Sequence, residues 1–165
     1  MKIDFTQYGE IESIPDNSYE LVYTPNNNRT FKIKKDFYKY KEIIVSSDEI
    51  LNIGTTALEL LPAAGNRKYY DWYAYIEYNF NSVAYTMGSP FSIQQGTVNK
   101  MPFGLLAASS EDAVAIVRPS FGTGTAYYFY PNQALRLSTL SGADPTDGDG
   151  TLRIKLYYKT ITFTK

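Results

Sequence analysis

The 165-residue sequence contains no cysteine and no histidine. Without cysteine there are no disulfides, no thiolate nucleophile and no cysteine-ligated zinc or iron-sulfur centre. Without histidine there is no Ser-His-Asp or Cys-His catalytic group, no imidazole base and no histidine metal site. These absences exclude most hydrolase mechanisms, and we expect neither a cofactor nor an enzymatic activity.

Long apolar runs are also missing. No stretch approaches the roughly 20 apolar residues of a transmembrane helix, and residues 1–16 lack the apolar core of a signal peptide. The formal net charge is −1, and the 16 lysines and arginines are spread along the chain, unlike the basic patch of a nucleic-acid-binding protein. The sequence therefore predicts a soluble cytoplasmic product, with neither a membrane nor a nucleic acid as its partner.

One local cluster of lysines interrupts the even distribution of charge. It alternates with aromatic and apolar residues, which favours the solvated face of a strand over the alternative, an anion-binding patch. The cluster consists of Lys32, Lys34, Lys35, Lys39 and Lys41.

Aromatic residues and turn signals dominate what is present. Sixteen tyrosines and nine phenylalanines favour strands, because flat rings pack well on a pleated surface. Clusters of glycine, proline, asparagine and aspartate recur from Pro15 to Gly150 and leave only short runs between them. Only residues 47–51 and 103–109 suit a single helical turn. The pattern predicts an all-β sandwich or barrel with at most one or two single-turn helices.

The clearest strand is predicted over residues 67–80, where apolar residues at alternate positions include Trp72 and Ile76. The opposite face of this strand also carries aromatic rings, and a strand with aromatics on both faces is usually covered on both. This second face therefore predicts an oligomer interface or the binding surface of an appended arm. Its candidate interface residues are Tyr69, Tyr73 and Tyr75.

A second clear strand is predicted over residues 151–163. Leu152, Ile154 and Leu156 are expected to point inward, and a slip of phase near Tyr157 and Tyr158 suggests a β-bulge or a change of neighbouring strand. Weaker strands are predicted over residues 19–24, 30–35, 42–45, 57–61, 91–94, 114–118, 126–130 and 134–139.

The expected domain organisation is one sandwich domain, residues 46–165, preceded by an N-terminal arm or edge hairpin, residues 1–45. Residues 1–16 alternate single apolar residues with polar ones and cannot build a core, which favours an assembly arm that binds a partner. The alternative is that this segment forms the first edge strand of the domain. The candidate arm residues are Ile3, Phe5, Tyr8, Ile11 and Ile14.

Two groups of acidic residues could carry chemistry. Asp71 and Glu77 share one strand face, but at about 3.3 Å per residue they lie roughly 20 Å apart, too far for a glycosidase pair. Residues 144–150, Asp-Pro-Thr-Asp-Gly-Asp-Gly, could ligate calcium, but the twelfth position of an EF-hand loop is Lys155 rather than glutamate. We favour a tight turn over a calcium site and predict no metal.

Several short motifs between Ser47 and Phe163 follow one another in an order that resembles a family of small bacteriophage virion structural proteins. The resemblance covers about two thirds of the chain, and the order and spacing of the motifs matter more than any one of them. The matching pieces are Ile50-Leu51, Gly54-Thr55-Thr56, Leu61-Pro62-Ala63-Ala64-Gly65, Ala84-Tyr85-Thr86, Leu105-Leu106-Ala107-Ala108, Asp147-Gly148-Asp149-Gly150-Thr151-Leu152 and Tyr157-Tyr158.

This resemblance implies a jelly-roll-like antiparallel β-sandwich in a non-enzymatic capsid decoration, head-fibre or tail-accessory subunit. It also implies a homo-oligomer, most simply a trimer, whose partners include other virion proteins such as the major capsid protein. The expected location is the virion, after synthesis in the host bacterial cytoplasm. The alternative function is a tail or fibre adhesin domain that binds host surface glycans. Exposed aromatics at loop tips would favour glycan binding, and exposed aromatics on strand faces would favour assembly.

Overall fold

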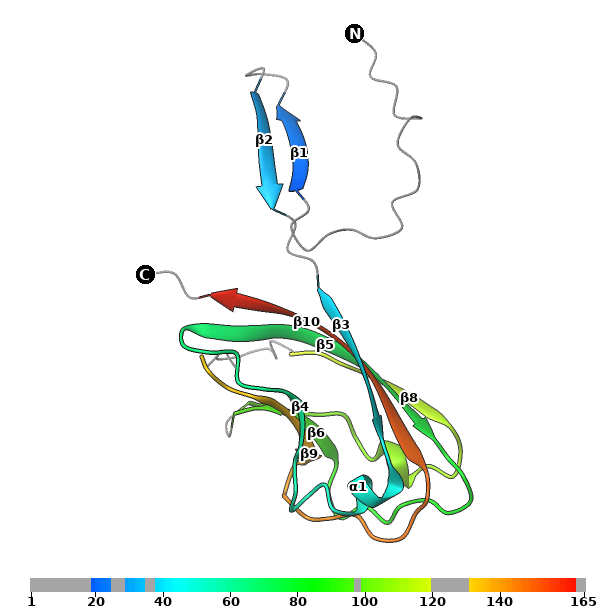
Figure 1. The fold of residues 1–165 in the computed structure, drawn as a ribbon. Helices are drawn as coiled ribbons and strands as arrows, with labels where there is room; N and C mark the ends of the chain where they lie inside the picture. Colours follow the sequence, from blue (N-terminus) through cyan, green and yellow to red (C-terminus); the bar gives the residue numbers. More distant parts are fainter. Residues whose placement is uncertain (1–18, 25–28, 35–37, 97–98, 120–130, 163–165) are drawn as a thin grey trace, which may run out of the picture. The chain divides into compact units, whose positions relative to one another are not determined.

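The computed structural model describes residues 19–24, 29–34, 38–96, 99–119 and 131–162. The chain divides into two compact units, Met1–Phe37 and Tyr38–Lys165. In the first unit, β1 (Tyr19–Thr24) and β2 (Arg29–Lys34) form an antiparallel two-stranded sheet (Figure 1). The arm residues Ile3, Phe5, Tyr8, Ile11 and Ile14 lie outside the described residues, so the arm stays a prediction.

The second unit is a sandwich of two four-stranded antiparallel sheets, which Figure 1 shows as two layers. The first sheet has the strand order β3-β10-β5-β8, and the second has the order β4-β9-β6-β7. The strands are β3 (Lys39–Val45), β4 (Leu58–Leu61), β5 (Lys68–Asn79), β6 (Phe91–Gln95), β7 (Asn99–Pro102), β8 (Ala113–Val117), β9 (Leu135–Thr139) and β10 (Thr151–Thr162).

The pairing of these strands is nested. β3 pairs with β10, β4 with β9, β5 with β8 and β6 with β7, so the chain folds as one long antiparallel hairpin wrapped into two layers. This is the topology of an eight-stranded jelly roll, and it confirms the predicted fold class. β3 belongs to the sandwich because it pairs with β10, and the two compact units therefore divide after Phe37, whereas the sequence suggested a division near residue 45.

The core lies between the two sheets and follows the predicted alternation. Along β5 the residues from Tyr70 to Tyr78 alternate between buried and more exposed, and Leu152, Ile154 and Leu156 of β10 are fully buried. The second sheet contributes Leu60, Phe91, Ile93, Leu135 and Leu137 from the opposite side.

Of the two explanations for a slip near Tyr157 and Tyr158, the bulge is wrong, whereas the neighbours of β10 do change there, because its described pairing with β3 ends at Tyr158. β10 pairs with β5 in one unbroken register from Thr151 to Thr162. Tyr157 keeps the outward phase of β10, and Tyr158 keeps the inward phase and packs edge-on against Tyr70. The slip was only apparent, because two adjacent tyrosines on opposite faces hide the alternation of apolar and polar residues.

Both predicted helical turns are confirmed. Helix α1 (Ser47–Leu51) begins after Ser46, whose Oγ accepts a hydrogen bond from the Glu49 N–H at 3.4 Å, while Glu49 Oε2 accepts one from the Ser46 N–H at 2.8 Å. This capping box satisfies two backbone donors at the helix start. A 3₁₀ turn, η2 (Leu106–Ala108), occupies the second position. No helix among the described residues is long and apolar enough to cross a membrane.

One observed strand has no counterpart among the predicted ones, and one predicted strand cannot be compared. The sequence of β7, Asn-Lys-Met-Pro, has no β-branched or aromatic residue and ends in proline, which is tolerated because β7 is an edge strand. The strand predicted over residues 126–130 lies outside the described residues.

Two aspartates of the segment 144–150 hold distant loops together. Asp144 Oδ1 accepts hydrogen bonds from the N–H groups of Gly54 and Thr55 at 2.7 and 2.9 Å. Asp149 Oδ1 accepts from the N–H groups of Ser82 and Val83, both at 2.9 Å, and its Oδ2 accepts from the Ser82 hydroxyl at 2.6 Å. Through these hydrogen bonds the two carboxylates clamp loops that are distant in the sequence.

The same hydrogen bonds lower the pKa values of both carboxyl groups, because they stabilise the ionised form. The Ser82 hydroxyl is the largest cause for Asp149, whose pKa falls to about 2. The pKa of Asp144 is also lowered, chiefly by the N–H of Thr55.

We expect the free energy of unfolding to fall as the pH drops from about 4 to about 2. The pKa of Asp149 is about 2 in the folded chain and about 3.9 in the unfolded chain. The hydrogen bonds of Asp149 therefore stabilise the fold fully above about pH 3.9, and this contribution is lost as the pH falls through the folded pKa. Asp149→Asn should flatten this acid limb, as thermal melts at a series of pH values would measure. Glu111→Gln, at an exposed residue whose side chain has no described partner, is the control. An unchanged acid limb in Asp149→Asn would contradict the assignment.

Candidate interaction face on the first sheet

The outer face of the first sheet is built from alternate residues of its four strands. The antiparallel register aligns these residues in rows across the sheet, so residues far apart in the sequence become neighbours. Three of the rows are Ile44-Arg153-Glu77-Val114, Glu42-Lys155-Tyr75-Ile116 and Tyr40-Tyr157-Tyr73.

Five tyrosine rings gather on this face, and we call them the tyrosine cluster: Tyr38, Tyr40, Tyr73, Tyr75 and Tyr157. The rings of Tyr73 and Tyr157 stack with centroids 4.8 Å apart and planes 7° apart. Tyr38 meets Tyr73 edge-on at 5.2 Å, and Tyr40 lies 5.2 Å from Tyr157. The contacts hold the rings in one continuous aromatic surface, of which four rings are carried by strands and Tyr38 immediately precedes β3.

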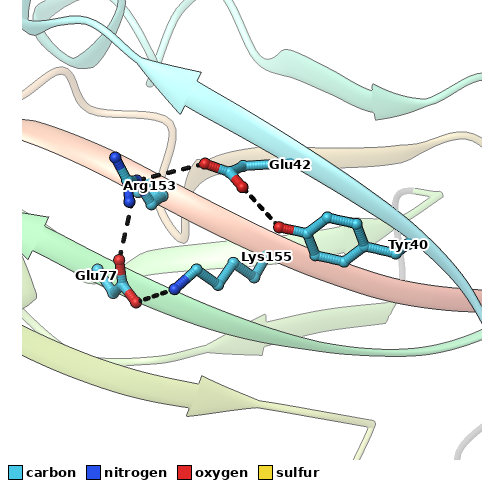
Figure 2. A network of polar contacts seen from close by, with 5 residues as sticks. All are labelled: Tyr40, Glu42, Glu77, Arg153 and Lys155. Atoms are coloured by element: carbon cyan, nitrogen blue, oxygen red, sulfur yellow. Dashed lines mark hydrogen bonds and ion pairs between the residues drawn. The ribbon is translucent and has the colours of Figure 1, made fainter.

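A charge network borders the tyrosine cluster on one side, and Figure 2 shows it. Arg153 lies between Glu42 and Glu77, at 3.5 and 4.0 Å, and Lys155 pairs with Glu77 at 2.5 Å. The Tyr40 hydroxyl donates a hydrogen bond to Glu42 at 2.6 Å, which is the main reason that the pKa of Tyr40 rises to about 12.

A second, smaller network borders the cluster on the other side. Asp71 accepts a hydrogen bond from the Tyr38 hydroxyl at 2.7 Å and pairs with Lys159 at 3.2 Å. The hydrogen bond with Asp71 raises the pKa of Lys159, and the ammonium group also lies 5.0 Å from the centre of the Tyr38 ring. Exposed ion pairs of this kind stabilise a fold little, but they leave few uncompensated charges on the face.

The face also carries a cleft of about 600 Å³ between the tyrosine cluster and the end of β8. Its lining combines aromatic and aliphatic side chains with one acidic and one basic residue. Arg118 is the basic residue, and its guanidinium has no hydrogen bond or ion pair within the described part of the chain. The lining residues are Tyr38, Tyr69, Asp71, Trp72, Tyr73, Tyr75, Ile116, Arg118, Pro119 and Ile161.

Exposed aliphatic residues lie at both edges of this face. The exposed fraction is 55% for Ile44 on β3, and 66% and 65% for Val114 and Ile116 on β8. The outer face of the second sheet differs, because its central rows carry polar and charged residues, with Glu59 opposite Arg136 and Gln94 opposite both Arg136 and Lys100. The two outer faces are therefore chemically distinct, and the first is suited to contact with another protein.

All three predicted interface residues lie on this face: Tyr73 and Tyr75 belong to the tyrosine cluster, and Tyr69 lines the cleft. The sequence prediction missed Tyr38, Tyr40 and Tyr157. The alternation of β10 could have identified Tyr157, had its phase been extended past Leu156. Tyr38 and Tyr40 carried no such signal, because they precede the segment that was expected to belong to the domain.

The two acidic residues that were considered as a possible catalytic pair form ion pairs with lysines instead. Asp71 and Glu77 lie in the two separate ion-pair networks described above. Among the described residues, no group of three or more acidic side chains is close enough to hold a metal ion.

No family model matches the chain, and neither the curated proteins nor the solved structures contain a significant match.

Proposed function

We propose that this chain is a non-enzymatic structural protein of a bacteriophage virion, most simply a capsid decoration or head-associated subunit. The observation that carries the assembly role is the position of the exposed aromatics on a strand face. The assignment to a phage comes from the sequence resemblance over residues 47–163, and the jelly-roll topology is compatible with it, since viral capsid domains use this fold. A fold alone does not define a function.

The outer face of the first sheet is the surface proposed for assembly, with Tyr69, Tyr73 and Tyr75 in contact with other subunits. Its internal ion pairs allow the face to be covered without leaving many buried charges unpaired, which would be costly. Tyrosines that are held by ring stacking also lose little conformational freedom on binding, and tyrosine is enriched at binding hot spots. The partners are further copies of this chain, with a trimer expected, and the major capsid protein.

Fractionation of dissociated particles tests the location, because a virion protein must be recovered with either the capsid or the tail fraction. Addition of purified protein to particles that lack it then tests the face. Tyr73→Ala should reduce occupancy by about tenfold or more, as expected for a hot-spot residue. Arg136→Ala, on the outer face of the second sheet, should leave occupancy unchanged. Equal losses in both variants, or recovery of the protein outside the particle, would contradict the proposal.

Sedimentation tests whether the chain associates with further copies of itself. Sedimentation velocity of the purified chain at micromolar concentration should give an oligomer, and Tyr73→Ala should shift it to a smaller species while circular dichroism stays unchanged. A wild-type monomer would argue against the outer face as an interface between copies.

The cleft gives a specific reason to keep a second candidate, a tail or fibre adhesin domain that binds host surface glycans. Tyrosine rings can stack on sugar rings, and Arg118 and Asp71 could bond their hydroxyl or carboxylate groups. Retention of the protein on immobilised host glycans, abolished by Tyr69→Ala and retained in Arg136→Ala, would favour this function over assembly.

A further inference from the structure

Among the described residues, the two sheets of the sandwich have four edge strands, β3, β8, β4 and β7, and exposed edges must be protected against pairing with other chains. Three of them carry a protective feature. Lys39, Lys41 and Glu42 lie on β3, β4 has a register shift after Glu59, and β7 contains Lys100 and ends in Pro102. Charges, bulges and prolines are the usual means of blocking an edge.

Strand β8 carries none of these features. Its sequence, Ala-Val-Ala-Ile-Val, is uncharged, regular and rich in β-branched residues, and Val114 and Ile116 are each about two-thirds exposed. Within the described residues, β8 has no neighbour on the side away from β5. An unprotected apolar edge of this kind is a template for strand addition.

We propose that two copies of the chain pair through β8, antiparallel and centred on Ala115, to join their first sheets into one continuous sheet. The strand is self-complementary in this register. Val114 of one copy lies opposite Ile116 of the other on the outer face, and Ala113 lies opposite Val117 on the inner face. The contact has twofold symmetry, so the same strand serves both copies.

The residues that flank β8 make the register electrostatically specific. With Ala115 at the centre, Asp112 of each copy lies opposite Arg118 of the other. Arg118 has no described partner within its own chain, and Asp112 uses Oδ1 to accept the Phe80 N–H at 2.9 Å, which leaves Oδ2 available. Asp112 and Arg118 have the same parity as Val114 and Ile116, so the two ion pairs lie on the outer face at either end of the apolar contact.

This pairing is independent of the virion assignment, and it predicts a symmetry that the trimer does not contain. Alone it gives a dimer, and combined with a threefold contact through the tyrosine cluster it gives a hexamer. Both states differ from a monomer or a simple trimer in sedimentation.

Reciprocal charge reversal provides the test. In a pair of Arg118→Glu copies, each introduced carboxylate faces Asp112 of the other copy. In a pair of Asp112→Lys copies, each introduced ammonium group faces Arg118, so each variant repels itself. An equimolar mixture restores two attractive pairs. We expect each variant alone to weaken the twofold association by about tenfold, and the mixture to return to the wild-type sedimentation behaviour at the same total concentration.

A matched pair of apolar variants tests the strand itself. Ile116→Lys on β8 should abolish the twofold association, and Ile44→Lys, at a similarly exposed isoleucine on the β3 edge of the same face, should leave it intact. Circular dichroism melts establish that each variant is folded. The proposal is overturned if the wild type is a monomer or a simple trimer, or if folded Arg118→Glu and Asp112→Lys fail to restore association when mixed.

Discussion

Trp72→Ala is expected to lower the free energy of unfolding by about 4 kcal/mol, since truncation of a large buried aromatic removes transfer free energy and leaves a cavity. Trp72 lies at the middle of the inner face of β5 and is only 1% exposed. It is packed among side chains of both sheets, which cannot collapse onto the cavity without a shift of the sandwich. A loss of this size is a large fraction of the total stability of an ordinary domain.

A second variant separates the volume of Trp72 from its polarity. The indole N–H has no hydrogen-bond partner among the described residues, so Trp72→Phe loses volume but no hydrogen bond and should cost about 1 kcal/mol. Asn79→Ala, at the exposed end of β5, is the surface control and should change stability by less than about 0.5 kcal/mol.

Chemical denaturation followed by circular dichroism measures all three variants of this series. Tryptophan fluorescence cannot be compared, because Trp72 is the only tryptophan in the sequence. A loss in Trp72→Ala no larger than that in Asn79→Ala would show that the inner face of β5 is not the core.

The prediction of the fold from sequence succeeded where one physical signal was sufficient. Alternation over β5 and β10 identified their inner and outer faces, because a strand that is buried on one side must present its apolar residues at every second position. A serine followed by acidic residues likewise predicted a helical turn at residues 47–51, since a helix start needs acceptors for its free N–H groups, although the N-cap is Ser46 rather than Ser47.

Prediction failed where the decisive contact is distant in the sequence. Asp144 and Asp149 could be placed in a turn, but nothing near them specifies that their hydrogen-bond donors lie 67 to 90 residues away, at Ser82 and Gly54. The nested pairing of β3 with β10 is equally non-local, and this is why the boundary of the domain could not be set from local composition. The self-complementary pairing proposed for β8 could be inferred only from its position at a sheet edge.

For the candidate interaction face, prediction from the sequence succeeded for some residues and failed for others. Tyr73 and Tyr75 were identified from β5 alone, because two-sided aromatic strands are rarely exposed to solvent on one side. The stacking of Tyr73 on Tyr157, and the compensation of Arg153 by both Glu42 and Glu77, depend on the order of three strands in the sheet. Sequence could therefore supply the composition of the face but not its charge balance.

Gly54→Ala is expected to destabilise the fold by about 3 kcal/mol, near the upper end of the range for overpacked sites. A Cβ on Gly54 would overlap the carbonyl carbon of Ala143 and would lie 2.5 Å from its oxygen and 2.6 Å from the nitrogen of Asp144. All three are backbone atoms, so no side-chain rotation relieves the overlap. The loop must move, and movement separates Asp144 from the Gly54 and Thr55 N–H groups that it clamps.

Gly88→Ala is the matched control, because nothing lies within 4 Å of a Cβ at Gly88. Denaturation melts should show the full loss in Gly54→Ala and almost none in Gly88→Ala. Native-state hydrogen exchange adds a local readout, since the amides of Gly54 and Thr55 donate to Asp144 and should lose protection in Gly54→Ala before the amides of β5 do. If both glycine variants melt alike, the close approach of the two loops is not what stabilises this end of the sandwich. If Gly54→Ala alone is destabilised, the contact between the α1 loop and residues 143–144 is required to close the jelly roll at that end.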